Sequence, residues 1–182
     1  MDEHGRRGRI LVAIAREVIE AAPAARCAPI EWQEEWLRET GASFVTLRDD
    51  GELRGCIGTV DPHRALADDV AHNAYAAAYR DPRFPPVRPA ERARLEVEVS
   101  VLSPRAPIAA PSEAELAAML RPGVDGIVLE YEGRRATFLP QVWESLPDPI
   151  DFLAELRRKA RLPARFWHPG MQVSRYTVEK FR

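Results

Sequence analysis

The pentapeptide Arg54-Gly55-Cys56-Ile57-Gly58 contains the residue types of this sequence that are best suited to chemistry. A cysteine thiolate is a nucleophile, and a neighbouring guanidinium favours the thiolate over the neutral thiol. Glycine is costly inside a strand and marks places where a backbone or a ligand comes close. We therefore take Cys56 as a candidate nucleophile, Arg54 as its candidate cation, and the two glycines as candidate binding positions. The structural alternative is that Cys56 is simply a small buried apolar residue.

A β-hairpin is predicted around this pentapeptide, because two short apolar runs flank the turn-forming residues 49–51. A three-residue loop fits best, since it pairs Thr46 with Arg54. Side chains alternate along a strand, so Arg54 and Cys56 then share the face opposite the core. A two-residue loop would instead pair Arg54 with Leu47 and mix the two faces.

A proline-rich segment at residues 81–86 is predicted to be an extended loop, because proline fixes its own backbone and restricts the residue before it. We expect this loop to approach the hairpin, with Arg83 or Asp81 as a polar contributor to the site. The alternative is a helix stop in which Phe84 fills a hydrophobic gap.

A glycine-rich loop at residues 122–126 leads into another predicted strand, and such loops can present backbone N–H groups to an anion. Gly123, Asp125 and Gly126 are therefore candidate binding residues. The charge of Asp125 would repel a phosphate, and the lysine of a P-loop is missing. Nucleotide or RNA binding through this loop is accordingly the third-ranked functional interpretation.

Three histidines could serve Cys56 as a base, namely His63, His72 and His168, and sequence spacing does not choose among them. Asp68 and His72 are four residues apart on a predicted helix, which is a spacing that metal ligands use. Two or three scattered ligands are more often exposed ion pairs, so we expect neither a metal site nor a cofactor.

Glu96 and Glu98 share one face of the most regular alternating strand, at 95–102. Such a carboxylate pair can do acid and base work in a cleft, or can be the solvated side of an edge strand.

The remaining elements predict an α+β fold, a mainly antiparallel sheet with flanking helices. Arg157, Arg158, Lys159 and Arg161 form a basic cluster that either docks an acidic partner or is a solvated helix end. Helices are predicted over 9–22, 31–39, 61–80, 112–120 and from 148 to about 161, and strands over 127–131, 134–139 and 173–181, with 106–111 as a connector.

Composition indicates an ordinary globular chain of 182 residues, 46% of them hydrophobic, which can bury the core of a single domain. The net charge of −2 does not favour nucleic acid or an anionic membrane. We find no membrane-spanning run and no signal-peptide pattern, so we expect a cytoplasmic protein. The two cysteines, Cys27 and Cys56, predict no disulfide framework.

Four segments resemble signatures of the AMMECR1 domain family and occur in the order found in that family. They are LRGCIGT at 53–59, DPRFPP at 81–86, PGVDGIVLEY at 122–131 and TFLPQVW at 137–143. The resemblance implies one domain over residues 1–182, with a larger and a smaller subdomain and LRGCIG as its functional surface. It also makes Thr137 and Gln141 candidate polar members of that surface.

The resemblance implies partners more than a reaction. Similar prokaryotic proteins are called AmmeMemoRadiSam system protein A, a name shared with a Memo-like protein and a radical SAM protein. We therefore expect an accessory component acting with those two proteins, or one that recognises a small ligand on the same surface. The alternative is a cysteine-dependent enzyme that uses Cys56 as a nucleophile or redox thiol.

Overall fold

The computed structural model describes residues 2–21 and 34–182. The chain divides into two compact units. The first unit comprises the chain up to Leu102 together with Glu179–Arg182, and the second comprises Ser103–Val178. The helix predicted at 31–39 lies partly outside the described residues. Cys27 and Trp32 lie wholly outside them.

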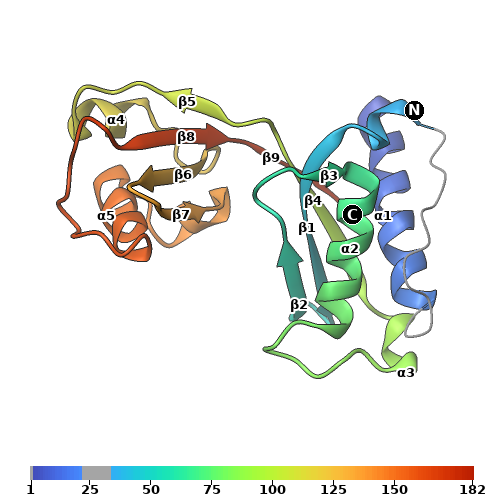
Figure 1. Ribbon diagram of the computed structural model, residues 1–182. Coiled ribbons are helices and arrows are strands. Elements are labelled where there is room, and N and C mark those ends of the chain that lie inside the picture. The colour runs from blue at the N-terminus through green and yellow to red at the C-terminus, as the bar shows by residue number, and fades with distance from the viewer. Residues whose placement is uncertain (1, 22–33) are drawn as a thin grey trace. The chain divides into compact units, whose positions relative to one another are not determined.

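The first unit is built on an antiparallel sheet in which β1 is the central strand (Figure 1). Its strand order is β2-β1-β4-β9, and the short β3 pairs with the beginning of β1. The strands are β1 (Thr40–Asp49), β2 (Glu52–Gly58), β3 (Arg64–Ala65), β4 (Glu96–Leu102) and β9 (Val178–Phe181). Glu96 and Glu98 belong to β4, which lies between β1 and β9. The alternative that these two residues lie on an edge strand is therefore wrong.

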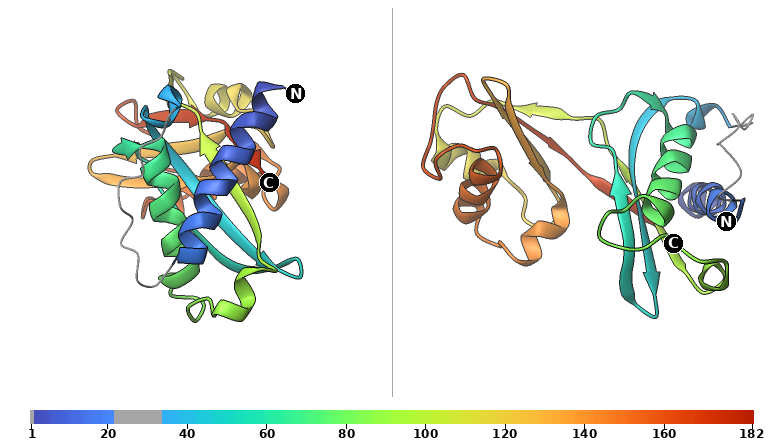
Figure 2. Two further views of the ribbon diagram at one scale, coloured as in Figure 1. Left: turned by 90° about the vertical axis from the view of Figure 1, so that its right-hand side faces the viewer. Right: turned by 60° about the horizontal axis from the view of Figure 1, so that its bottom comes forward.

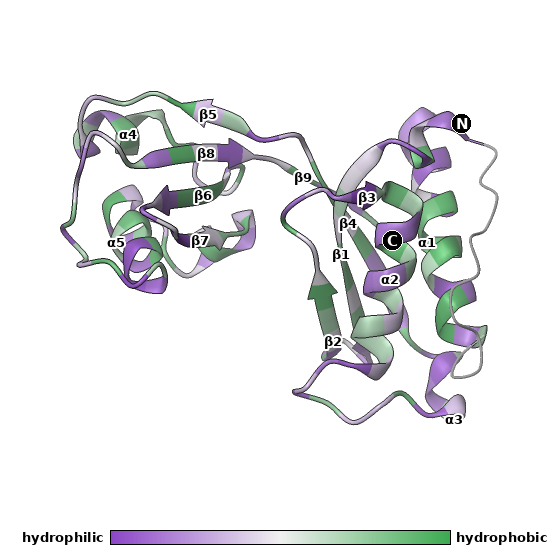
Figure 3. Ribbon diagram, viewed as in Figure 1, coloured by the Kyte–Doolittle hydropathy of each residue, from purple (hydrophilic) through white to green (hydrophobic). Residues whose placement is uncertain are grey.

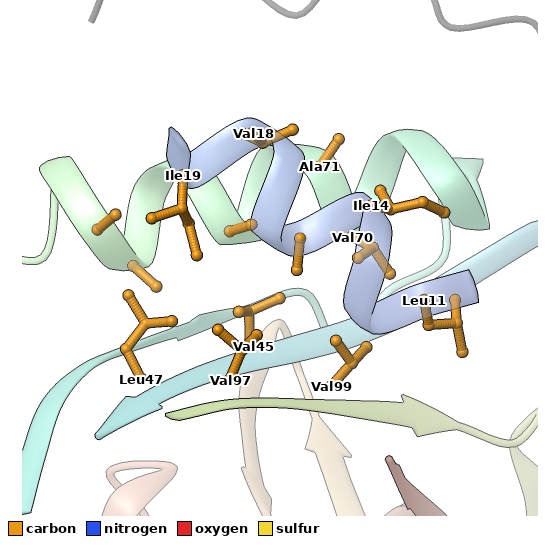
Figure 4. Close-up of a cluster of buried hydrophobic side chains, with 14 of the residues drawn as sticks. Leu11, Ile14, Val18, Ile19, Val45, Leu47, Val70, Ala71, Val97 and Val99 are labelled. Carbon is orange, nitrogen blue, oxygen red and sulfur yellow. The ribbon is translucent and has the colours of Figure 1, made fainter. Parts of the chain in front are cut away.

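Helices α1 (Glu3–Ala21) and α2 (Leu66–Tyr79) lie side by side on one face of this sheet (Figure 2). Val45 and Leu47 of β1 point into the core beneath them (Figure 4). The small side chains of α2, alanine at six of its fourteen positions, let its backbone approach the sheet closely. A four-residue helix, α3 (Pro89–Arg92), and a 3₁₀ turn at Glu35–Leu37 complete the unit.

Helix α2 begins later than predicted, at Leu66 rather than near residue 61. Arg64 and Ala65 pair with Gly41 and Thr40 as strand β3, so their backbones are extended and cannot join the helix.

The β1–β2 hairpin has a two-residue loop, which corrects the predicted three-residue loop. Asp50 and Gly51 have φ of 52° and 79°, the positive pair that a tight hairpin turn requires. Together with a β-bulge at Arg54, this turn places Thr46 opposite Cys56 rather than opposite Arg54.

A β-bulge restores the side-chain alternation beyond this turn. Leu47 pairs with Gly55 and Arg48 with Leu53, so Arg54 is the extra residue of β2. The bulge places Gly55 in the core layer, whereas Leu53, on the turn side of it, is exposed.

The second unit is a four-stranded antiparallel sheet of order β5-β8-β6-β7. Its core includes Trp143 and Phe152, whose rings stack 3.8 Å apart. The elements are β5 (Ala106–Ile108), α4 (Glu113–Met119), β6 (Gly126–Tyr131), β7 (Arg134–Phe138), a 3₁₀ turn (Pro140–Glu144), α5 (Pro149–Lys159) and β8 (Gln172–Tyr176). Antiparallel sheets with flanking helices confirm the predicted α+β class.

Two predicted segments at the ends of this unit are corrected. The strand predicted over 173–181 is two strands, β8 in the second sheet and β9 in the first, because Thr177 between them leaves the ladder and donates its N–H to the Ser103 hydroxyl. The predicted connector at 106–111 begins with strand β5, which pairs with β8.

Within the described residues, no helix combines the length and the apolar character that crossing a bilayer requires.

Candidate functional site

Cys56 lies in β2, at the edge of the first sheet, and is half-buried. Its side chain points away from α2, because the neighbouring Gly55 faces that helix. The hydroxyl of Thr46, on the adjacent strand, donates a hydrogen bond to the Cys56 Sγ over 3.4 Å. Phe44 and Thr46 of β1, Cys56 of β2 and Glu98 of β4 share this side of the sheet. We call these four residues the Cys56 face.

The loop after α2 binds the backbone of Cys56, as the proline-rich segment led us to expect. The carboxylate of Asp81 accepts the Cys56 N–H at 2.9 Å, and Arg83 Nη2 donates to the Cys56 carbonyl oxygen at 2.9 Å. Arg83 Nη2 also donates to Asp81 Oδ2 at 2.6 Å. These two side chains therefore satisfy both backbone groups that an edge strand would otherwise leave unpaired.

An ion pair between Asp81 and Arg83 holds these two side chains against the backbone of Cys56. The guanidinium of Arg83 and then the N–H of Cys56 keep the pKa of the buried Asp81 carboxyl well below its usual range. Asp81 in turn raises the pKa of Arg83, with smaller contributions from the Cys56 side chain. The cation next to Cys56 is therefore Arg83.

Arg54 has a different partner from the one predicted. Its Nε donates to Glu91 Oε1 of α3 at 3.1 Å, and the side chains of both residues are nearly buried. The backbone N–H of Arg88 and then the Arg54 guanidinium lower the pKa of Glu91 to about 2. The strict alternation that put Arg54 beside Cys56 fails because Arg54 occupies the bulge.

The two glycines beside Cys56 make room for parts of the protein itself. A Cβ on Gly55 would lie 2.2 Å from the carbonyl oxygen of Ala77 in α2, and one on Gly58 would lie 2.1 Å from the ring of Phe44. Close backbone approach is thus the reason for Gly55, and an aromatic ring occupies the space above Gly58.

A hollow of about 480 Å³ adjoins Thr46 and therefore the Cys56 face. Arg182 forms an ion pair with Glu98 at 2.6 Å here, whereas Glu96 is exposed. The hollow is lined by Arg16, Thr46, Arg48, Gly51, Glu96, Val97, Glu98 and Arg182. Its lining carries three arginines and two glutamates, and this mixture of charges suits hydrogen bonding to a polar surface more than selection of one charged ligand.

A buried polar cluster was not identified from the sequence as a unit. Asp69 Oδ2 accepts the N–H and the hydroxyl of Ser43, each at 2.8 Å, and the Asn73 amide at 2.9 Å. The same amide donates to the Ser43 carbonyl and reaches Thr59 Oγ1 at 3.2 Å. These bonds fix α2 on the sheet next to the end of β2. The sequence feature that could have indicated this cluster is the pair Asp69 and Asn73, four residues apart in an otherwise alanine-rich helix face.

Among the candidates in the second unit, Gly123, Asp125 and Gly126 have structural partners. The buried Asp125 accepts the Arg121 N–H at 2.9 Å and is ion-paired with the Arg121 guanidinium. Gly123 takes a φ of 78°, and a Cβ on Gly126 would lie 2.4 Å from the ring of Tyr176. Within the loop, the N–H groups of Val124 and Asp125, which an anion could have met, already donate to the Arg121 carbonyl.

Thr137 and Gln141 differ in their surroundings. The Thr137 hydroxyl donates to the Ile127 carbonyl at 2.8 Å and lies 3.0 Å from the Tyr176 hydroxyl. Gln141 is exposed on the 3₁₀ turn. Both belong to the second unit, whereas Cys56 and Arg83 belong to the first.

No histidine of the first unit hydrogen-bonds to Cys56. His63 lies 2.8 Å from the Asp61 carbonyl and beside Arg64, and partial burial is the largest cause of the lowered pKa of His72. His168 lies in the second unit, where its ring accepts the Gly170 N–H. Across residues 2–21 and 34–182, no three His, Cys, Asp or Glu side chains are grouped as metal ligands.

The sequence matches the sequence model of the AMMECR1 family over residues 12–181. A protein of Methanothermobacter thermautotrophicus is 39% identical over 184 residues, covering 96% of this chain and 93% of that protein. Protein MJ0810 of Methanocaldococcus jannaschii is 37% identical over 182 residues, covering 96% and 89% respectively. The crystal structure of uncharacterized protein PH0010 from Pyrococcus horikoshii has a TM-score of 0.83 at 34% identity and covers 97% of this chain and 91% of that one.

Proposed function

The chain belongs to the AMMECR1 family, and we propose that it is an accessory protein whose Cys56 face binds a partner in a system with a Memo-like protein and a radical SAM protein. The observation that carries this proposal is the binding of the Cys56 backbone by Asp81 and Arg83. It holds an edge strand rigid and presents one face of it, which is what a recognition surface needs.

In the part of the chain that the structure describes, no histidine is hydrogen-bonded to the Cys56 thiol, and this favours binding over catalysis. Cysteine nucleophiles in enzymes are activated by an adjacent base, most often a histidine. In the described part of the first unit, the Cys56 side chain accepts a hydrogen bond from the Thr46 hydroxyl and interacts with the Arg83 guanidinium, whereas His63 lies against the Asp61 carbonyl.

Co-purification tests the proposal. We would co-express the tagged chain with the Memo-like and radical SAM proteins of its own genome and measure co-elution by size-exclusion chromatography. Thr46→Lys places a long cation on the Cys56 face and is expected to abolish co-elution. The matched control is His72→Lys, on an exposed position of α2, and it should leave the complex intact. Co-elution that survives Thr46→Lys, or its absence in wild type, would contradict the proposal.

A thiol-dependent enzyme is the second candidate, and the contacts at Cys56 are the observation that favours it. The Thr46 hydroxyl donates to Sγ, and the Arg83 guanidinium interacts with the same residue. A hydrogen-bond donor and a cation near the sulfur are features that reactive cysteines share.

Alkylation distinguishes the two functions. The rate of iodoacetamide labelling of Cys56 would be followed against pH by peptide mass, in wild type and Arg83→Gln, with Cys27 replaced by Ser in both. Fast labelling of Cys56 well below pH ~8.5, where a free thiol ionises, would support the enzyme if Arg83→Gln abolishes it. A thiol that labels only after unfolding would exclude nucleophilic catalysis and leave the binding role.

A further inference from the structure

One corner of the second unit carries three exposed cations that have no carboxylate partner within residues 2–21 and 34–182. Arg134 stands at the start of β7, Lys159 is the last residue of α5, and Arg161 follows two positions later. Figure 3, coloured by hydropathy, shows hydrophilic stretches in α5. We propose that these three residues, here called the basic corner, form a docking surface for a short acidic segment of a partner protein.

The contacts of the basic corner fix its side chains without neutralising them. Arg134 Nη1 donates to the Arg161 carbonyl at 2.8 Å, which brings the two elements together. Lys159 Nζ donates to the Thr137 carbonyl at 2.9 Å and lies 5.0 Å from the centre of the Phe138 ring. Carbonyls and aromatic rings orient a cation but leave its net charge in place.

Three other arginines of this unit each have a carboxylate partner. Arg121 pairs with Asp125, Arg157 with Glu113 and Arg158 with Glu155. Most arginines of this unit are therefore paired. The basic corner differs from them because Arg134 is bonded to the Arg161 carbonyl, which brings cations of two elements, unpaired within the described residues, to one place.

The backbone at Arg161 argues against a merely solvated helix end. Cations at a helix C-terminus are favourable because they meet the negative end of the dipole. Arg161, however, has a φ of 60°, in the left-handed region. The Leu162 N–H bonds to the Arg157 carbonyl and the Arg161 N–H to the Arg158 carbonyl, each at 2.9 Å, so Arg161 occupies the terminal position where glycine is preferred.

Local stability alone would thus select glycine at position 161, because an L-residue there is strained. The strained residue is instead an arginine, and its backbone carbonyl accepts the Arg134 guanidinium. Strained residues are characteristic of functional positions, and at this one the residue carries a cation at the corner where α5 meets β7.

An acidic protein segment fits the basic corner better than nucleic acid does. Lys and Arg total 26 against 28 for Asp and Glu, so the chain as a whole offers a polyanion no general attraction. Three cations at one corner match a few carboxylates, whereas nucleic-acid binding draws on a longer basic track. The inference stands apart from the function proposed for the Cys56 face, which uses residues of the first unit.

Peptide binding tests the basic corner. Fluorescence anisotropy would follow a fluorescein-labelled octaglutamate peptide titrated with the full chain at low salt. We expect Arg134→Gln, Lys159→Gln and Arg161→Gly each to weaken binding about two- to five-fold, the effect of losing one exposed ion pair. Lys180→Gln removes the same charge from an exposed position of β9 and should change nothing.

A second measurement separates binding from folding. Arg161→Gly relieves the left-handed strain, so its Tm should rise while its affinity for octaglutamate falls. Equal binding by the corner variants and wild type would overturn the proposal, as would tighter binding of an eight-nucleotide DNA than of octaglutamate. A lowered Tm of Arg161→Gly would overturn the argument from strain.

Discussion

Asp81 is the residue on which the Cys56 face depends most directly. Its two carboxylate oxygens accept the Cys56 N–H, the Arg83 N–H and the Arg83 guanidinium, although the residue itself is buried. A buried carboxylate with this many donors organises the loop and the edge strand together.

Asp81→Asn is therefore expected to destabilise the chain by about 2 kcal/mol, because the amide has one acceptor oxygen and turns its NH₂ toward donors. Urea unfolding measures the change. Asp68→Asn, at an exposed position of α2, is the matched control and should stay within about 0.5 kcal/mol of wild type. Equal effects of the two substitutions would show that Asp81 is not the organising group.

Glu91 gives the chain a defined dependence on pH. Its pKa is lowered from an ordinary 4.5 to about 2 in the folded protein, chiefly by the Arg88 N–H and then by Arg54. A depressed pKa contributes stability that is full above pH 4.5 and is lost as the pH falls toward 2.

Glu91→Gln removes this contribution, so the difference in unfolding free energy between wild type and variant should be largest above pH 5 and shrink toward pH 2. Urea unfolding at several pH values measures it, with the exposed Glu52→Gln as control. A difference that stays constant with pH would mean that Glu91 does not titrate in this way.

At the scale of elements, the sequence predicted the hairpin but not its register. The alternating apolar runs and Asp50-Gly51 identify two strands and a turn, because these are local patterns. The bulge at Arg54 depends on a partner 37 positions later, Glu91, and on the fit of Gly55 beneath Ala77. Side-chain alternation alone could not include either contact.

Disulfide trapping distinguishes the observed register from the predicted one. With Cys27 replaced by Ser, Thr46→Cys should form a disulfide with Cys56 on mild oxidation, because these residues lie directly opposite each other. Phe44→Cys lies opposite Gly58 and should stay reduced. Under the three-residue loop, Phe44 would face Cys56, so the opposite pattern of cross-linking would restore that register. Mass spectrometry of the unreduced protein measures the result.

The contact between α2 and β2 predicts a ranking of glycine substitutions. A Cβ at position 55 would meet a backbone oxygen at 2.2 Å, so Gly55→Ala should cost about 3 kcal/mol through forced separation of helix and strand. Gly51 has open space around it and a φ of 79°, so Gly51→Ala should cost about 1 kcal/mol from backbone strain alone. Urea unfolding of both variants measures the order, and equal costs would contradict the close approach.

Elements with local start and stop signals were the ones that the sequence predicted well. The Asp148 carboxylate caps α5 by accepting the N–H of Ile150, and the Ser112 hydroxyl caps α4 by accepting that of Glu115. The division of residues 173–181 between two sheets was not predicted, since it depends on strands more than 60 positions away along the chain, β4 and β5.

At the scale of the whole molecule, the second unit is an insertion between two neighbouring strands of the first sheet. The chain leaves β4 at Leu102 and returns through β9, which pairs with β4. The entering and leaving segments are tied together, because the Ser103 N–H donates to the Thr177 carbonyl at 3.0 Å and the Thr177 N–H to the Ser103 hydroxyl at 2.9 Å. Insertions with adjacent ends are commonly able to fold alone.

We therefore expect the fragment 103–178 to fold without the rest of the chain. Its core of Phe152, Leu153 and Leu156 is fully buried, and its sheet pairs wholly within the fragment. A dispersed amide NMR spectrum and a cooperative urea transition would measure the folding, and Phe152→Ala, which costs about 4 kcal/mol in a buried core, should abolish both. The fragment keeps the two hydrogen bonds between Ser103 and Thr177 that the full chain has. A fragment that stays unfolded would therefore mean that the second unit takes its stability from the first. A folded fragment would allow the basic corner to be tested with the Cys56 face removed altogether.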